Sequence, residues 1–530
     1  MHHEAVTTSA SALTATAPGR RSASRVDAAA AGVAAAGLGL GVSEVIAALL
    51  PGATSLVAAI GQVVIDRQPP GAKDFVVALF GTNDKLALEI VVVVAALAFG
   101  AGLGIVAARR FAIGALGFAA FGVLGFLAAL SDPLANPGIV ALESAVSVGL
   151  AVQTLSWLLS LAVRQPMGGT VATSDPARRS FLLRTGAVGL SALVVGVGGR
   201  SLLDRSRTAP IPAADLPPAS ELVPPIAAGA DLAPTTPGLT PIVVPNDRFY
   251  RIDTALLVPN VDAATWKLRI HGLVERETTL TWNELLALPM FEQYVTIACV
   301  SNEVGGNLVG NAKWTGVRLR DVLEIAGVSS SATQLVGRSV DGFTAGMPTA
   351  WVMDPAREPM IAVQMNDEPL PPAHGYPARL IVPGLYGYVS ATKWLSELEL
   401  TTLEDFDGYW IPLGWSKEAP ILTQSRIDTP GGFAPVSAGR IPIAGIAWAP
   451  DRGIAGVEVA IDGEWREAQV STPISDTTWV QWVVPWDATP GTHRISVRAT
   501  DGTGAVQEEL PSPPAPDGAR GWHTVEVRVA

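Results

Sequence analysis

Long apolar stretches dominate the first two hundred residues and constrain the fold more than any other feature of the sequence. Four of them lie at about 27–50, 86–108, 111–131 and 138–163. Each is close to the roughly 20 residues that an α-helix needs to cross a bilayer. The sequence therefore predicts an α-helical membrane domain over residues 27–200. A further apolar piece, at 53–65, is too short to span.

Composition supports this interpretation and excludes several classes of protein. Hydrophobic residues make up 49% of the chain although aromatic residues make up only 6%, as in membrane helices. The net charge of −12 and the lack of a long Lys/Arg run argue against a nucleic-acid partner. The single cysteine excludes an intramolecular disulfide and any multi-cysteine zinc or iron–sulfur site. At 530 residues, the chain is long enough for about three domains.

Basic residues between the apolar stretches predict the orientation of the helices. They lie before the first stretch (Arg20, Arg21, Arg25), between the second and third (Arg109, Arg110) and after the fourth (Arg164, Arg178, Arg179). The opposite connection, SDPLANP, has none. Because cytoplasmic loops are enriched in Lys and Arg, the amino terminus and residue 164 are both expected inside.

A fifth apolar run begins with Arg178-Arg179-Ser180-Phe181-Leu182. This pattern resembles a twin-arginine export motif. The alternative is an ordinary fifth helix with basic flanks. Both interpretations place residues after 200 outside the cytoplasm and make this a multi-pass protein of the cell membrane.

The apolar stretches also contain ionisable residues, whose role has two interpretations. Glu44, Glu89 and Glu143 lie in or near the predicted helices, where a carboxylate is costly and often functional. A proton or ligand role is one interpretation, and a helix-end position that reaches water is the other. None of the six histidines lies in a predicted membrane helix, so no bis-histidine haem is expected.

The flanking and connecting segments are polar or proline-rich. Residues 1–26 are small and polar and are expected to be disordered. Residues 201–241 are expected to form a stiff, extended linker, since nine prolines fall between 204 and 241. This linker would hold the exported part of the chain off the membrane.

The remaining residues predict two soluble domains. Residues 242–408 mix strands such as WKLRIHGLV with short helices such as TWNELLALP, which favours an α+β domain. Residues 409–530 contain alternating runs separated by turns, which predicts an all-β, immunoglobulin-like sandwich. No nucleotide-binding loop of either usual type is visible, because GLGLG at 37–41 lies in a predicted membrane helix.

The single cysteine, Cys299, follows the predicted strand VTIA and precedes the turn SNEVGG. A lone cysteine is most often a small buried hydrophobe. A nucleophilic role would need a base, and no local signature of a cysteine protease is present. A third possibility is a metal ligand, because thiolate is a soft donor. The residues alone leave these three open.

The segment VTIACVSNEVGG…AKWTGVRLRDVLEIAG resembles the molybdenum-binding segment of the sulfite oxidase family. The segments RFYRIDTALLVP, DGFTAGMPTAWVMDP and HGYPARLIVPGLYGYVSATKWL resemble the same family in the same order, and 418–530 resembles its dimerisation domain. The resemblance implies a molybdopterin cofactor whose molybdenum takes Cys299 as ligand. It also implies a homodimer.

The resemblance further implies a set of cofactor-binding residues. These are Tyr250, Arg251, Asn302, His374, Arg379, Ser390, Thr392 and Lys393. Basic and hydroxyl groups suit the phosphate that ends the pterin. Each residue also has an ordinary interpretation, such as a solvated charge for Arg379 or Lys393 and a core position for Tyr250.

The sequence departs from the sulfite-oxidising pattern around the metal. Glu303 and Val304 replace arginines that would bind an oxyanion, Phe343 replaces a tyrosine, and Asp253 replaces a histidine. Cys299, Phe343 and Glu303 are the expected catalytic residues. Fewer cations make a poorer binding site for a dianion. S- and N-oxides are therefore as acceptable as sulfur oxyanions as the expected substrates.

The sequence therefore predicts a membrane-anchored molybdopterin oxidoreductase that transfers an oxygen atom in a two-electron reaction. No cytochrome b5-like segment is visible, so an external electron carrier or quinone is the expected partner. One rival is a membrane-tethered, immunoglobulin-like binding module whose α+β domain holds no cofactor. A second rival is a transporter or sensor, supported by the intramembrane glutamates.

Overall fold

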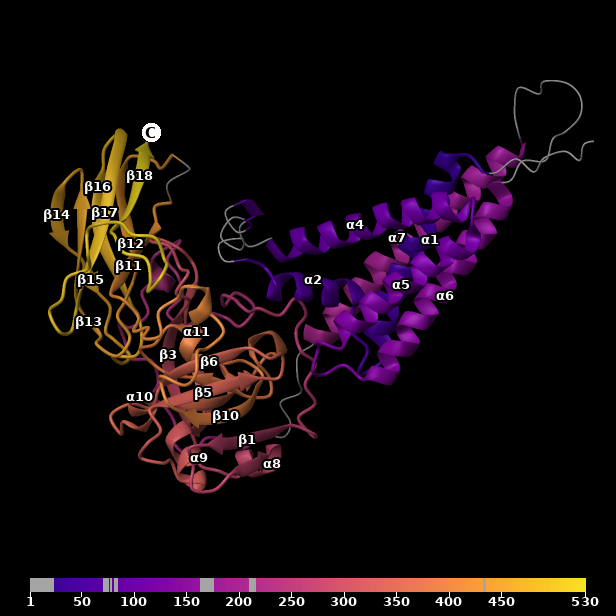
Figure 1. Cartoon of the computed structure of the whole chain (residues 1–530). Helices are drawn as coiled ribbons and strands as arrows, with labels where there is room; N and C mark the ends of the chain where they lie inside the picture. Colours follow the sequence, from indigo (N-terminus) through magenta and orange to yellow (C-terminus); the bar gives the residue numbers. More distant parts are fainter. Residues whose placement is uncertain are drawn as a thin grey trace, which may run out of the picture. The chain divides into compact units, whose positions relative to one another are not determined.

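The computed structural model describes residues 23–69, 76, 79–80, 84–162, 176–208, 216–431 and 435–530. Apart from residues 68–73, the described residues up to Leu203 form a helical unit, and those from Asp204 form a β-rich unit (Figure 1). Each unit has its own hydrophobic core. The first 22 residues, Arg164 and most of the segment before Arg178 lie outside the described residues.

The helical unit consists of long apolar helices. They are α1 (Arg25–Leu49), α2 (Leu56–Asp66), α4 (Asp84–Ala107), α5 (Phe111–Ala129), α6 (Pro137–Ala162) and α7 (Pro176–Thr208). Among the described residues, five helices are long and apolar enough to cross a membrane, and α2 is not one of them. Length and composition thus agree with the predicted spans.

The first helix begins slightly earlier than expected. Ser24 caps α1, since its side chain accepts a hydrogen bond from the Asp27 backbone amide at 3.1 Å. Asp27 also places a negative charge in the first turn, where it favours the helix dipole. Arg25 and Val26 are therefore helical, although residues 1–26 were expected to be disordered.

Small residues let the helices of this unit approach closely. Gly32 on α1 faces Gly100 and Gly104 on α4, and a Cβ atom at Gly104 would lie 2.9 Å from the Cα of Gly32 and against the carbonyl oxygen of Ala28. Helix association in lipid depends on this kind of close packing, because hydrocarbon surroundings remove the usual hydrophobic driving force. The α1–α4 contact therefore depends on glycine.

Gly104→Leu is expected to destabilise the helical unit by about 1–3 kcal/mol, the usual cost of overpacking a well-packed contact. Gly102→Leu is the matched control, because a Cβ atom at Gly102 meets nothing within 4 Å on the same helix. Thermal unfolding of the full chain in detergent would measure both. Equal melting temperatures for the two variants would contradict close α1–α4 packing.

The segment after the last long helix differs from the expected spacer. Helix α7 continues to Thr208, with Arg205 and Arg207 in its last turn, where basic groups favour a helix carboxyl end. Residues 209–215 lie outside the described residues. From Ser220 to Leu239 the chain packs on the β-rich unit. Ser220 N donates to Met290 O at 2.9 Å, and Ala230 is fully buried.

The β-rich unit contains a first five-stranded sheet in the order β2-β1-β10-β5-β6 (Figure 1). Its strands are β1 (Lys267–Gly272), β2 (Thr278–Thr281), β5 (Gln334–Ser339), β6 (Thr344–Pro348) and β10 (Leu395–Thr401). All neighbours are antiparallel except β1 and β10, which are parallel. The sheet therefore joins the first and last strands of this part of the chain.

A second sheet carries β3 next to β4, followed by β7 and β8, with β9 also paired to β7. Its strands are β3 (Met290–Ala298), β4 (Val309–Arg318), β7 (Met360–Met365), β8 (Glu368–Pro369) and β9 (Arg379–Ile381). Four short helices connect the two sheets: α8 (Trp282–Leu286), α9 (Leu319–Ala326), α10 (Thr349–Met353) and α11 (Gly387–Ser390). The 3-10 turn η3 (Pro372–His374) connects β8 and β9 within the second sheet. This mixture agrees with the α+β prediction.

The last part of the chain is a sandwich of two four-stranded sheets, in the orders β11-β12-β16-β15 and β14-β13-β17-β18. The strands are β11 (Gln424–Thr429), β12 (Gly439–Trp448), β13 (Ile454–Ile461), β14 (Glu464–Glu467), β15 (Gln469–Val470), β16 (Val480–Ala488), β17 (Gly491–Asp501) and β18 (His523–Val529). Buried residues from both sheets form one core. The two sheets thus pack face to face, as the alternating pattern predicts.

The sandwich is joined to the α+β part by shared core and hydrogen bonds. Trp448 and Trp479 from the sandwich belong to the core of the α+β sheets. Trp479 Nε1 donates to Ile242 O at 2.9 Å, and its backbone amide donates to Thr296 Oγ1 on β3 at 2.8 Å. Strand β3 is therefore held on one side by β4 and on the other by the sandwich.

Candidate functional site

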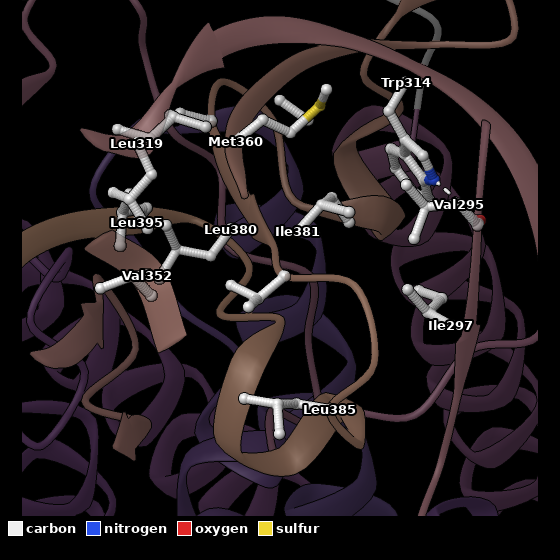
Figure 2. Packing of buried hydrophobic residues seen from close by; sticks show 14 of the residues in the cluster. Val295, Ile297, Trp314, Leu319, Val352, Met360, Leu380, Ile381, Leu385 and Leu395 are labelled. Carbon is white, nitrogen blue, oxygen red and sulfur yellow. Dashed lines mark hydrogen bonds between the residues drawn. The ribbon is translucent and has the colours of Figure 1, made fainter. Parts of the chain in front are cut away.

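Strand β3 brings Cys299 to the site. Val295 and Ile297 are buried in the core, and Trp314 on β4 donates from Nε1 to Val295 O at 3.3 Å (Figure 2). Alternation along the strand places Val295, Ile297 and Cys299 on the same side of the backbone. Cys299 follows the last residue of β3 and is only 9% exposed.

The loop after β3, residues 299–308, is closed by hydrogen bonds. The amide of Cys299 donates to Leu308 O at 2.9 Å, and Leu308 N donates to the side-chain oxygen of Asn302 at 2.8 Å. Asn302 N in turn donates to Cys299 O at 3.1 Å. Asn302, an expected cofactor contact, therefore fixes the conformation of the Cys299 loop. Ser301 Oγ lies 2.9 Å from Cys299 Sγ.

The sandwich braces the far side of the Cys299 loop. Arg426 on β11 donates from Nη1 to Gly306 O at 2.9 Å. Gly305 has a φ of +77°, and a Cβ atom there would collide with the ring of His523 on β18. Glycine at 305 is thus required both by the left-handed backbone and by the close approach of the sandwich.

Three basic residues expected to bind the cofactor are buried together. His374, Arg379 and Lys393 are 5%, 7% and 8% exposed. Arg379 Nη1 donates to His374 O at 3.2 Å, and Lys393 Nζ donates to Ala373 O at 3.4 Å. The ring of His374 donates from Nε2 to Asn246 O at 2.9 Å and packs edge-on against Phe249. We call His374, Arg379 and Lys393 the cationic cluster.

Burial and mutual repulsion change the titration of the cationic cluster. Burial lowers the pKa of Arg379 to about 10 and that of Lys393 to about 8, with the nearby Asp253 carboxylate opposing both shifts. Burial, followed by the charge of Arg379, lowers the pKa of His374 to about 4. The cluster therefore holds its positive charges at a cost, as a site built for an anion does.

Asp253 is the counterion of this cluster. Lys393 Nζ donates to Asp253 Oδ2 at 2.8 Å, and Arg251 Nε lies 2.9 Å from the same oxygen. One carboxylate thus faces the charges of Arg251, Arg379 and Lys393. Asp341 is a second carboxyl group near Asp253 and Lys393, and burial raises its pKa. Positive charge remains in excess.

One donor in the cluster has no acceptor in the protein. Arg379 Nε is buried and, among the described residues, makes no hydrogen bond. A buried unsatisfied donor on a charged group is costly, and such groups are normally satisfied. A phosphate accepts bidentate hydrogen bonds from guanidinium groups. The orphaned Nε and the excess positive charge therefore fit a phosphate-bearing ligand.

Two tyrosines lie near the thiol, and one of them, Tyr250, also lies near the cluster. Tyr250 stacks on Phe249 at 5.3 Å, and Tyr250, Cys299 and Arg379 are close enough to interact electrostatically. Tyr386 lies near Cys299 as well, and burial raises its pKa to about 12. Burial also raises the pKa of Tyr250. Both phenols therefore stay protonated near neutral pH and can donate hydrogen bonds but not act as bases.

The remaining predicted residues have mainly structural contacts. Ser390 Oγ donates to Tyr386 O at 2.9 Å within α11, and Thr392 Oγ1 donates to Gly337 O at 3.4 Å. Phe343 lies in the β5–β6 turn, where its amide donates to Asp341 Oδ1 and its ring packs near Tyr409. Glu303 is exposed in the Cys299 loop. Catalytic roles for Phe343 and Glu303 stay predictions.

Three residues of the site are not identified by sequence patterns. Asp253 stands out in the sequence only as a replacement for histidine, yet it is the counterion of Lys393. Tyr386 and Asp341 were not predicted at all. Both residues come near the site only in the folded chain. Tyr386 is the N-cap of α11, and Asp341 lies in the turn after β5. Their spacing from Cys299 in the sequence matches no local motif.

The pKa of His374 predicts an acid-sensitive stability. An unfolded histidine titrates near 6.5, whereas the buried ring resists protonation until about pH 4. The unfolded state therefore binds more protons between these values, and stability falls by about 3 kcal/mol as the pH drops through them. Denaturant unfolding of cofactor-free protein should show this loss, and His374→Gln should flatten it. Identical pH slopes for both proteins would contradict it.

Comparisons with known proteins show which proteins this part of the chain resembles. Residues 255–410 match the family model of the "Oxidoreductase molybdopterin binding domain". Mitochondrial sulfite oxidase of Mus musculus is 29% identical over 342 residues, which cover 54% of this chain and 62% of the relative. Nitrate reductase [NADH] of Hordeum vulgare is 30% identical over 317 residues, which cover 48% of this chain and 34% of the relative.

Among solved structures, the sulfane dehydrogenase SoxCD from Paracoccus pantotrophus has 22% sequence identity and a TM-score of 0.47, and the match covers 54% of this chain and 83% of that chain. The chain spans less than two thirds of the length of both curated relatives, with 62% of the mouse protein and 34% of the barley protein. Together, the family model and the curated relatives support the interpretation of residues 255–410 as a molybdopterin-binding oxidoreductase domain.

Proposed function

We propose that this protein is a membrane-anchored molybdopterin-dependent oxidoreductase of the sulfite oxidase type. One observation carries the proposal: Tyr250 interacts electrostatically with Arg379 of the buried cationic cluster, whose Nε is orphaned, and with Cys299, the only thiol of the chain. The residues that match the family model, 255–410, include Arg379 and Cys299. The small-molecule substrate and the electron partner follow from this class of enzyme.

The described residues have distinct roles in this proposal. Cys299 would ligate the molybdenum as a thiolate, because a metal-bound thiol is deprotonated. Arg379 and Lys393, with His374 beside them, would hold the phosphate of the pterin. The cofactor, when bound, supplies oxygen-atom transfer coupled to exchange of two electrons. Tyr250 and Tyr386, both protonated, would donate hydrogen bonds next to the metal.

The substrate class follows from the charges at the Cys299 loop. Glu303 and Val304 stand where arginines would bind an oxyanion, so neutral S- or N-oxides are as suitable as sulfur oxyanions. The two electrons would pass to or from an external carrier or quinone. The apolar helices would anchor the chain, and the basic flanks support an extracytoplasmic site.

Two further features extend this proposal. The sheet orders β11-β12-β16-β15 and β14-β13-β17-β18 correspond to the two sheets of an immunoglobulin-type sandwich, which supports a dimerisation domain. Arg178 and Arg179 lie exposed in the first turns of α7. Their exposure is compatible with recognition by an export pathway, and equally with the basic flank of an ordinary membrane helix.

The proposal is tested by the metal and pterin content of the purified full chain. About one molybdenum and one pterin per chain are expected from a host that makes the cofactor, as for a site with one protein thiolate. A host unable to make the cofactor is the control and should yield neither. Protein without molybdenum from the competent host would overturn the proposal and favour the rival binding module.

A further inference from the structure

A group of polar residues lies within the apolar helices of the helical unit. Glu44 on α1, Glu89 on α4, Glu143 on α6 and Arg200 on α7 are each five to eight residues from the end of their helix. At about 1.5 Å per residue, all four lie within about 12 Å of those ends. Contacts between them place them at one end of the helical unit.

Hydrogen bonds organise this group into two serine–glutamate pairs. Ser43 Oγ donates to Glu143 Oε1 at 2.9 Å, and Ser55, which caps α2, donates to Glu44 Oε1. Arg200 Nη2 lies 2.6 Å from Glu89 Oε1, and Nη1 lies 4.0 Å from Glu44 Oε2. Glu44 and Glu89 therefore share a guanidinium group.

Glu143 has a different environment. It is fully buried, and both Ser43 and the Thr54 backbone amide approach its carboxyl group. Of the helices packed against α6, α1 contributes the like charge of Glu44, and α5 has no titratable residue between Phe111 and Ala129. A carboxylate buried without a cation is among the most costly groups in a protein.

Further unsatisfied oxygen atoms lie close to Glu143 along α6. Glu143 Oε2 is buried without a hydrogen-bond partner, and so are the hydroxyl oxygens of Ser144 and Ser147. Ser147 lies four residues after Glu143 and hence on the same face of α6, and its backbone carbonyl faces Gly39 of α1. Ser43 keeps its lone pairs after donating to Glu143. Several oxygen donors are thus available at one buried position.

We propose that Glu143 binds one exchangeable positive charge, either a proton or an alkali cation such as Na⁺. The serine oxygens complete the site, and Glu44 is the neighbouring charge that Arg200 already compensates. Two nearby carboxyl groups in a low dielectric cannot both ionise unless a cation joins them. This site is independent of the molybdopterin proposal and gives the helical unit a role besides anchoring.

The test uses the full chain in detergent, with infrared spectra and melting temperatures measured in sodium and in choline chloride at fixed pH. In choline chloride, wild type is expected to show the carbonyl band of a protonated carboxyl group, which Glu143→Gln removes. Asp66→Asn, an equal charge change on the exposed end of α2, should leave the band intact.

The comparison of sodium chloride with choline chloride distinguishes a bound proton from a bound alkali cation. A band unaffected by sodium identifies the ligand as a proton. A band that sodium removes, with a rise in melting temperature absent from Glu143→Gln, identifies an alkali cation. Ser43→Ala keeps the carboxyl group and should shift the frequency of the band, because Oε1 loses its hydrogen bond. Spectra and melting temperatures that neither Glu143→Gln nor sodium changes would overturn the proposal.

Discussion

Cys299→Ser is expected to lower the rate of oxygen-atom transfer by more than about 100-fold. Residues that merely orient a metal ligand already contribute 10–100-fold, and a hydroxyl is a harder and more weakly ionised donor than a thiol. The assay would test both proposed substrate classes. Reduced viologen would supply electrons to dimethyl sulfoxide or trimethylamine N-oxide, and ferricyanide would accept electrons from sulfite. The electron paramagnetic resonance signal of Mo(V) should change in the same variant.

Ser301→Ala is the matched control for this result. Its hydroxyl lies 2.9 Å from Cys299 Sγ, so the variant alters the surroundings of the thiol without replacing it. We expect a much smaller loss of rate. Cys299→Ser with wild-type activity and an unchanged Mo(V) signal would exclude Cys299 as the ligand and make it a buried core residue.

Arg379→Met is expected to reduce the bound pterin by at least 100-fold while leaving the cofactor-free protein folded. Charge-assisted hydrogen bonds contribute about 1.5–3 kcal/mol each, and a guanidinium group can make two to a phosphate. The cofactor-free variant should be as stable as wild type or more so, because it loses a buried, unsatisfied charge. Pterin fluorescence after release and denaturant unfolding measure the two effects separately.

Arg269→Met provides the control for this second prediction. Arg269 lies on β1, where its side chain is 49% exposed and pairs with Glu277. The chemical change is the same, so pterin content should stay at the wild-type level. A parallel loss of stability and pterin in Arg379→Met would contradict a direct role in binding and indicate a structural one.

The sequence predicted the parts of this structure that depend on local pattern. Apolar stretches of helical length became α1, α4, α5, α6 and α7, and alternating runs became the strands of the sandwich. Cys299 was placed correctly at the end of a strand because VTIA is apolar and SNEVGG is a turn. Helix ends were less accurate, since caps such as Ser24 and the last turn of α7 shift them by a few residues.

Other features of the site required the folded chain. His374, Arg379 and Lys393 were predicted from motifs, yet only the structure shows that Asp253 is their shared counterion. Tyr386 reaches the thiol because α11 packs beside the end of β3, and no spacing in the sequence encodes that approach. The proline-rich segment was expected to be a spacer, but residues from Ser220 onward hydrogen-bond to β3 because their carbonyl and amide groups find partners there.

The brace between the sandwich and the Cys299 loop has a consequence for biosynthesis. Ribosomes make β3 and its thiol long before they make His523, yet the loop at Gly305 packs against that histidine and Arg426 holds Gly306. A nascent chain therefore carries an incomplete site until its final strand has been translated and has paired in its sheet. Under the proposed function, loading with the cofactor is then expected to follow synthesis, and a chain truncated before His523 is expected not to be loaded.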